Sequence, residues 1–330
     1  MKRTGCMSPR ATRLGETLLA SVLLALTAAG CPRPCPTTMV PLESLVAEYN
    51  ANAASVPRLW ARARIQLTLT TPSGLGLTVG TVSPLDPPNA LLLLSRGANP
   101  LGPHNFVLIG RETASLELLR VGSSAEEDVY YLWYGFGDRT RAWWGRNKFA
   151  GAPGVAEMPI DPNQLLAVLG VCPLPADFTQ PPTVAMTMNA TPGQCAYVLT
   201  YIDRQPVTRR LTFRREIHFR WDKDEPRRPF LVHFFDAEGR RIMTATLKDY
   251  RPIKAAHLPA PPAAASVMPT DIEINWPERK SRVHIVLSEM TTADKWQVEA
   301  CRFREHLPIS MPPDHVVQVD EHLETQGALK

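Results

Sequence analysis

The sequence lacks several features that would assign it to a common functional class. After residue 31, no apolar run approaches the roughly 20 residues that a membrane-crossing helix needs. No block of lysine and arginine suits a nucleic-acid partner. The motifs G-x-S-x-G, S-x-x-K and H-E-x-x-H and the P-loop are all absent. We therefore expect no helical membrane span, no nucleic-acid partner and no catalysed reaction.

What the chain does have is a short apolar run that ends at a cysteine. Basic residues precede the run 18–30, whose last three residues are small, and Cys31 follows directly. A basic start and a short apolar segment are typical of a secretory signal peptide. The small residues before the cysteine resemble the lipobox of bacterial lipoproteins, in which diacylglycerol is attached to the thiol before cleavage. We expect residues 1–30 to be removed and Cys31 to carry diacylglycerol and a fatty acid such as palmitate, with a plain secretory signal as the alternative.

Removal of residues 1–30 changes the charge and the location that we expect. Four basic residues and one acidic residue leave with the signal, so the net charge falls from +4 to about +1. Two or three acyl chains, at about 0.8 kcal/mol per buried methylene, hold a protein on a membrane durably. Residues 31–40 are rich in proline and predict a short tether. No acidic residue follows Cys31 directly, which favours the outer membrane, facing the periplasm, and we expect a monomer.

The cysteines fit an oxidising compartment. The chain has 6, of which one lies in the signal and one is the expected lipidation site. Cys172 and Cys195 bracket a proline-rich excursion, and a bridge between them would contribute about 3 kcal/mol by closing that loop. We expect this pair, although four remaining cysteines allow three pairings and unpaired thiols are the alternative. No spacing typical of a zinc site occurs in the mature chain.

Two kinds of periodicity predict the secondary structure. Apolar residues recur every three to four positions over 41–54 and predict an amphipathic helix that packs on a sheet. A second helix is expected after the N-cap Asp161. From residue 59 onward apolar and polar residues alternate, as in antiparallel strands. The predicted strands begin at 59 and 75 and continue at 90–96, 105–110, 115–121, 129–136, 211–221, 230–235, 241–250, 271–276 and 282–288.

About ten to twelve strands with two or three helices indicate a mainly β protein of the α+β class. The long alternation favours a large antiparallel sheet that is curled into an open half-barrel and covered by the helices. We assign residues 41–290 to this domain and residues 291–330 to a C-terminal extension without an assigned role.

Short segments along 41–290 carry a family resemblance through their order. They are the N-terminal helix running into LWARARI (59–65), then PNALL (88–92), FVLIG (106–110), MPIDP (158–162), PFLV (229–232), DAEGR (236–240), LKDY (247–250), LP (258–259) and IEINWP (272–277). In this order they resemble the LolA/LolB-like family of periplasmic lipoprotein carriers and outer-membrane lipoprotein receptors. The resemblance implies an open half-barrel with helices as a lid. Because the family's receptor is itself lipid-anchored, Cys31 indicates the receptor-like side.

The resemblance also implies that the concave face of the sheet is apolar and takes the acyl chains of lipid or of an acylated lipoprotein. Such a cleft suits this cargo because acyl chains bind a dry surface while the polar head stays in water. A filled core is the alternative, and the chain would then be a lipid-tethered structural or adaptor protein with a protein partner. The candidate cleft residues are Ile65, Leu67, Leu69, Leu75, Leu77, Val79, Leu91, Leu93, Phe106 and Leu108.

Further side chains are candidates for a membrane or partner surface. The tryptophans among them lie between arginines, a combination typical of membrane interfaces. The arginines belong to a basic hairpin, 203–228, that could meet anionic headgroups. His218 and His233 are expected to be solvated or satisfied by neighbours, so we expect no metal and no cofactor. The surface candidates are Trp143, Trp144, Arg214 and Arg220.

Overall fold

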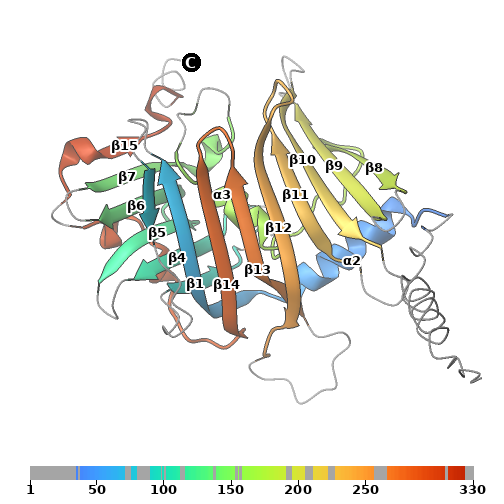
Figure 1. The fold of residues 1–330 in the computed structure, drawn as a ribbon, viewed down its shortest axis with the longest axis horizontal. Helices are drawn as coiled ribbons and strands as arrows, with labels where there is room; N and C mark the ends of the chain where they lie inside the picture. Colours follow the sequence, from blue (N-terminus) through green and yellow to red (C-terminus); the bar gives the residue numbers. More distant parts are fainter. Residues whose placement is uncertain are drawn as a thin grey trace, which may run out of the picture.

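Fifteen strands of the described part of the chain hydrogen-bond into one sheet, and many of them follow the alternation of apolar and polar residues (Figure 1). The computed structural model describes residues 35, 38–70, 76–79, 90–97, 99, 102–111, 116–136, 139–152, 155, 158–190, 195–204, 211–221, 227–255, 266–308 and 311–323. The strands are β1 (Arg58–Thr70), β2 (Gly76–Val79), β3 (Ala90–Ser95), β4 (Asn105–Arg111), β5 (Glu117–Ser124), β6 (Val129–Phe136), β7 (Arg139–Arg146), β8 (Thr183–Asn189), β9 (Ala196–Arg204), β10 (Leu211–Arg220), β11 (Pro229–Phe235), β12 (Arg241–Pro252), β13 (Val267–Trp276), β14 (Ser281–Thr291) and β15 (Val316–Gln318).

The sheet is open and strongly curled. Its spatial order is β15-β7-β6-β5-β4-β3-β1-β14-β13-β12-β11-β10-β9-β8, and β2 pairs with β1 outside this path. The pairings between these strands are antiparallel except for β15 with β7, and Lys254 and Thr291 form an isolated parallel bridge. At the centre, β1 pairs with β14, so that Ile65 lies opposite Ile285. The predicted fold class, a mainly β protein with an open curled sheet, is confirmed.

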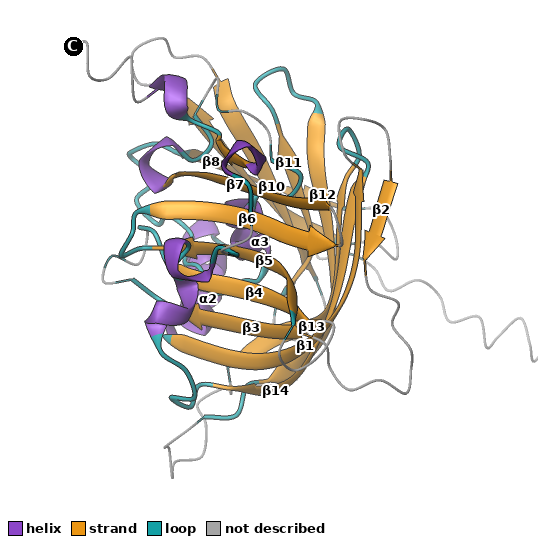
Figure 2. Ribbon diagram, turned by 90° about the vertical axis from the view of Figure 1, so that its left-hand side faces the viewer, coloured by secondary structure: helices purple, strands orange, loops and turns teal. Residues whose placement is uncertain are grey.

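The sheet curls around two helices, which lie inside the curve (Figure 2). α2 (Leu42–Ala54) follows the helical apolar period and buries the side that contains Tyr49. α3 (Pro162–Val168) begins at the predicted N-cap Asp161, whose carboxylate accepts hydrogen bonds from two backbone N–H groups of the first turn. Both helices predicted from the sequence are confirmed.

Amide side chains fix α2 in place. Asn50 accepts a hydrogen bond from the backbone N–H of Leu174 at 2.7 Å and donates to the carbonyl of the same residue at 2.9 Å. Asn52 makes the same pair of bonds with Val267, at 2.9 and 3.0 Å. Because each amide satisfies both backbone groups of one residue, α2 is attached to the loop after α3 and to the first residue of β13.

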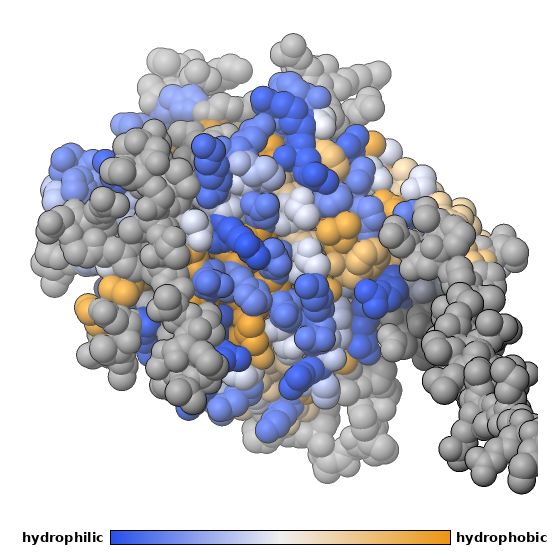
Figure 3. Space-filling model, viewed as in Figure 1, coloured by the Kyte–Doolittle hydropathy of each residue, from blue (hydrophilic) through white to orange (hydrophobic). Residues whose placement is uncertain are grey.

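The main core lies between the concave face of the sheet and the two helices. Long strands contribute every second residue to it, for example Ala63 and Ile65 of β1 and Ile272 of β13. The outer face of β12–β14 is mostly hydrophilic, as Figure 3 shows. Among the described residues, no helix combines the length and the apolar composition that crossing a bilayer requires.

Residues 292–308 and 311–323 lie over the outer face of β3–β7 and bury a second apolar layer there. Trp296 packs with Leu93 and Ile109 in one cluster, and in another Phe303 stacks on Tyr131 with ring centroids 5.1 Å apart. This part of the sheet is therefore covered on both faces. The short 3-10 helices among the described residues are η1 (Asn147–Phe149), η2 (Val298–Cys301), η3 (Arg304–His306) and η4 (Pro313–His315).

Buried polar groups hold this outer cover in place. Arg120 is buried, donates to the carbonyl of Ala300 and forms an ion pair with Glu117 at 2.8 Å. The indole N–H of Trp296 donates to the carbonyl of Leu59 at 3.1 Å. Since a buried charge needs a partner, these contacts make the C-terminal segment part of the folded unit.

One part of the sheet differs from the expectation. β8 forms within the excursion 172–195, for which the sequence indicates little structure. Its residues alternate between exposed and half-buried, and it pairs with β9 at the end of the sheet. The sequence did not predict this strand for two reasons. Prolines are abundant before Thr183, and a short edge strand buries few side chains, so its alternation of apolar and polar residues is weak.

Candidate functional site

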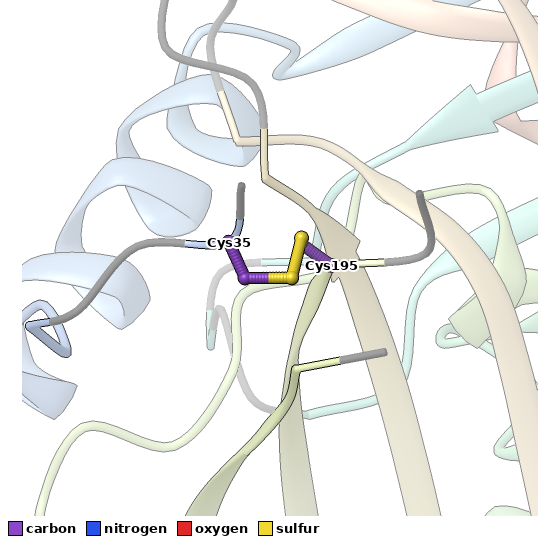
Figure 4. Close-up of a disulfide and its surroundings, with 2 residues drawn as sticks. All are labelled: Cys35 and Cys195. Atoms are coloured by element: carbon purple, nitrogen blue, oxygen red, sulfur yellow. A yellow bond between two sulfur atoms is a disulfide. The ribbon is translucent and has the colours of Figure 1, made fainter. Parts of the chain in front are cut away.

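The predicted disulfide between Cys172 and Cys195 is wrong. Cys195 is bonded to Cys35, 160 residues earlier, with the two Cα atoms 5.5 Å apart (Figure 4). Cys172 is a free, half-buried thiol. The prediction favoured the pair nearest in sequence, whereas the fold brings the start of β9 beside the chain that precedes α2. The bond attaches the predicted tether to the sheet, so that only residues 31–34 of it precede the attachment.

A cavity of about 630 Å³ lies between α3 and the loop that follows it. One wall is formed by the end of α3, the opposite wall by residues 172–182, and residues 102–104 complete it. Its volume falls within the range of about 300–1,000 Å³ that is typical of small-molecule sites. The apolar lining includes Pro103, Leu166, Ala167, Pro173, Pro175 and Ala176.

Five polar side chains also line this cavity, of which Asp177 and Gln180 belong to the loop after α3. The side-chain nitrogen of Asn163 is buried without a hydrogen-bond partner in the described part of the chain. His104 Nδ1 accepts a hydrogen bond from the backbone N–H of Gly97 at 3.2 Å, and burial, with the nearby Arg96, lowers the pKa of this imidazole. Burial raises the pKa of the Cys172 thiol to about 12. The cavity therefore offers one unused donor and an unreactive thiol.

The predicted cleft residues do not line the cavity. Ile65, Leu67, Phe106 and Leu108 are buried in the main core, because α2 and α3 fill the concave side of the curled sheet. These four residues therefore belong to a packed core, which was the alternative to an open cleft.

The prediction for Leu91 and Leu93 is wrong. Leu92 and Leu94 belong to the main core, while Leu93 and the half-buried Leu91 pack on the other face against Trp296. Four consecutive leucines contain no alternation, so the sequence could not assign the faces. Of the remaining candidates, the backbones of Leu69, Leu77 and Val79 lie in the paired strands β1 and β2, and Leu75 and the lipidation candidate Cys31 lie outside the described residues.

The predicted tryptophan surface is also wrong. Adjacent residues of a strand point to opposite faces, so Trp143 is buried in the main core beside Tyr134, with ring centroids 5.6 Å apart. Trp144 is half-buried on the outer face against Phe303, at 6.3 Å, and the guanidinium of Arg146 lies over its ring. Neither side chain is presented as an exposed interfacial anchor.

Arg214 and Arg220 lie on the outer face of β10. The guanidinium of Arg214 lies 3.9 Å from the ring centroid of Phe235, and that of Arg220 lies 5.6 Å from the centroid of Phe230. The positive charges expected from the sequence are therefore present on this face, but both guanidinium groups are stacked on aromatic rings of the neighbouring strand.

Glu216, His218 and His233 converge between these arginines, which the sequence does not indicate. One ligand atom from each lies within 4.8 Å of the others. Burial lowers the pKa of His233 to about 4, and His218 and Arg241 add to this effect. Burial also lowers the pKa of His218, although Glu216 opposes it. The alternation along β10 places two of these residues on one face, but only the register with β11 brings in His233.

Comparison of the sequence with known proteins gives no match: no family model fits it, and no curated protein does. Several solved structures are similar in fold to this chain. A DUF1329 family protein from Desulfovibrio piger has a TM-score of 0.47 at 9% identity, over 82% of this chain and 100% of that chain. A LolA superfamily protein from Nitrosomonas europaea has a TM-score of 0.43 at 12% identity, over 82% and 100%.

A putative outer membrane lipoprotein-sorting protein domain from Vibrio parahaemolyticus has a TM-score of 0.41 at 12% identity, over 81% of this chain and 94% of that chain. The likeness is one of fold.

Proposed function

We propose that this chain is a lipid-anchored protein of the bacterial cell envelope that binds an acyl chain, from a lipid or an acylated lipoprotein, in the cavity beside α3. Its role would be in lipoprotein localisation or outer-membrane maintenance, without a reaction of its own. The observation that carries the proposal is the cavity of about 630 Å³ with its mainly apolar lining. This cavity replaces the wider cleft that the sequence led us to expect.

The anchor would hold the folded domain close to the membrane. Cys31 lies four residues before Cys35, and four residues span at most about 14 Å. Cys35 is bonded to Cys195 at the start of β9. A lipid on Cys31 would therefore keep the sheet within this short distance of the bilayer surface, which is the source of acyl chains.

The cavity suits the end of an acyl chain and one polar group. Ten buried methylenes would contribute about 8 kcal/mol, before the cost of ordering the chain is subtracted. The unpaired amide of Asn163 can donate a hydrogen bond to a carboxylate or ester oxygen. Because burial keeps the Cys172 thiol protonated, the cavity is suited to binding and not to covalent attachment.

The filled concave face favours a second candidate, a lipid-tethered adaptor whose partner is another envelope protein. In that case the cavity would be an incidental space between α3 and its following loop. The two candidates differ in whether the purified protein takes up acyl chains.

The test uses a form that begins at Pro32, which keeps Cys35 and its disulfide. Native mass spectrometry and lipid extraction identify what copurifies, and titration with a fluorescent fatty acid measures uptake. We expect about one acyl chain per protein. Ala167→Trp fills the cavity from α3 and is expected to abolish uptake. Ala51→Trp, on an exposed position of α2, is the matched control and is expected to bind normally.

A lipid-free protein that takes up no fatty acid would favour the adaptor. Uptake that persists in the Ala167→Trp chain would place the binding elsewhere on the protein and contradict the proposal for this cavity.

A further inference from the structure

Two neighbouring strands bring two imidazoles and one carboxylate to the same patch of the outer face. Glu216 and His218 are two residues apart on β10, so their side chains share a face. The antiparallel register with β11 places His233 directly opposite Glu216. Three residues of types that coordinate metal ions therefore meet on one face of the paired strands β10 and β11.

The ligand atoms approach one another without forming hydrogen bonds. The Oε2 atom of Glu216 lies 3.8 Å from Nε2 of His218 and 3.9 Å from Nδ1 of His233, and all three atoms lie within 4.8 Å of one another. These separations are longer than hydrogen bonds. Nε2 of His218 is buried and has no hydrogen-bond partner in the described part of the chain. A buried polar atom without a partner requires an explanation, and a bound ion supplies one.

The arginine nearest to Glu216 contacts only one of its carboxylate oxygens, so the other oxygen, Oε2, is available to a metal ion. Arg214 lies 3.5 Å from Oε1 of Glu216 and stacks on Phe235. Arg220 stacks on Phe230. Arg214 can thus remain an outer partner of Glu216 while Oε2 faces the two imidazoles, an arrangement that orients carboxylate ligands in metal sites.

We propose that Glu216, His218 and His233 form a binding site for a divalent transition-metal ion, with Zn²⁺ as the representative ion and water in the open position. Two imidazoles and one carboxylate are a known zinc ligand set, and imidazole nitrogen suits first-row transition metals. A tetrahedral site with bonds near 2.1 Å needs ligand atoms roughly 3.4 Å apart, so the present separations close with small side-chain rotations. Calcium is a poor fit because it takes six to eight oxygen ligands.

The bound ion would link β10 to β11 through their side chains. This inference does not depend on the cavity beside α3 or on the lipid anchor. If the protein binds no acyl chain, the metal-site proposal is unaffected. If it binds no metal ion, the acyl-chain proposal is unaffected.

The test is a titration of the full, untagged chain with Zn²⁺ in non-ionic detergent after treatment with a chelator, with a chromophoric competitor reporting free metal. We expect one ion per chain. Glu216→Gln, His218→Ala and His233→Ala are each expected to weaken binding by at least about 10-fold. Loss of a residue that only hydrogen-bonds to a metal ligand already weakens binding by about 10-fold, so loss of a ligand is expected to weaken it at least as much. His284→Ala is the matched control, because His284 also contacts a carboxylate, with Nε2 3.0 Å from Asp271, and it is expected to bind Zn²⁺ as the unaltered chain does.

Two further measurements guard against a folding artefact. Thermal unfolding in chelator shows whether each variant is folded, and the isosteric Glu216→Gln keeps the shape of the site. X-ray absorption of the zinc-loaded chain is expected to show two imidazole ligands with oxygen and no sulfur. No binding by the unaltered chain, equal affinity in the three variants, or a sulfur-containing coordination shell would each overturn the proposal.

Discussion

The bond between Cys35 and Cys195 gives a sharp quantitative prediction. It closes a loop of 160 residues, for which the chain-entropy model gives about 5 kcal/mol, while typical measured contributions are about 2–4 kcal/mol. We expect Cys35→Ser to lower the free energy of unfolding by about 2–4 kcal/mol. Cys172→Ser is the matched control. It removes a thiol that is free in the structure and is expected to change the free energy by about 1 kcal/mol or less.

Equilibrium urea unfolding of the form that begins at Pro32 measures both changes. A reductant is expected to bring the unaltered protein to the stability of Cys35→Ser and to leave that variant unchanged. Digestion without reductant, followed by mass spectrometry, is expected to recover a peptide containing Cys35 joined to one containing Cys195. Recovery of a peptide that joins Cys172 to Cys195, or an equal loss of stability in Cys172→Ser, would refute the assignment.

Three further predictions concern the cavity, the outer cover and pH. Asn163→Leu removes the unpaired buried donor, so we expect thermal unfolding to show unliganded stability that is unchanged or higher by about 1 kcal/mol, while titration shows weaker binding of a fatty acid carboxylate. Trp296→Ala uncovers the outer face of β3 and β4 and is expected to cost about 3 kcal/mol in urea unfolding; a loss below about 1 kcal/mol would mean that the C-terminal segment does not pack there. The pKa of His104 is lowered in the folded state, so its contribution to stability is present above about pH 6.5 and is lost as the pH falls toward the folded value. Unfolding at pH 7 and pH 5 is expected to show a smaller pH dependence in His104→Gln than in the unaltered chain, and an equal dependence would contradict this assignment.

The sequence predicts elements whose signals are local. The helix over 41–54 follows from apolar spacing alone, and the start of α3 follows from Asp161 and the proline after it. The hairpin strands around 230–250 follow from a short apolar segment, the turn residues after it, and the alternation along residues 241–247. In each case the residues that determine the element lie within it, so no distant contact is needed.

Pairings between distant segments are not available from such signals. Cys35 and Cys195 meet only because the sheet brings the start of β9 to the chain before α2. The cluster on β10 and β11 likewise depends on the register that sets Glu216 opposite His233. The cavity depends on how the loop 172–182 folds back on α3, which no periodicity describes.

One distant contact did leave a usable trace in the sequence. The four leucines 91–94 and the apolar stretch 105–110 do not alternate, which is typical of strands buried on both faces. The two predicted helices can cover one face, so a second segment must cover the other. Residues 291–330, left without a role, contain Trp296 and Cys301, whose side chains are buried against that outer face, and Phe303, which is buried on the outer face of β6 and β7. Loss of alternation in a strand therefore predicts that an additional segment packs on the sheet, even where it does not identify that segment.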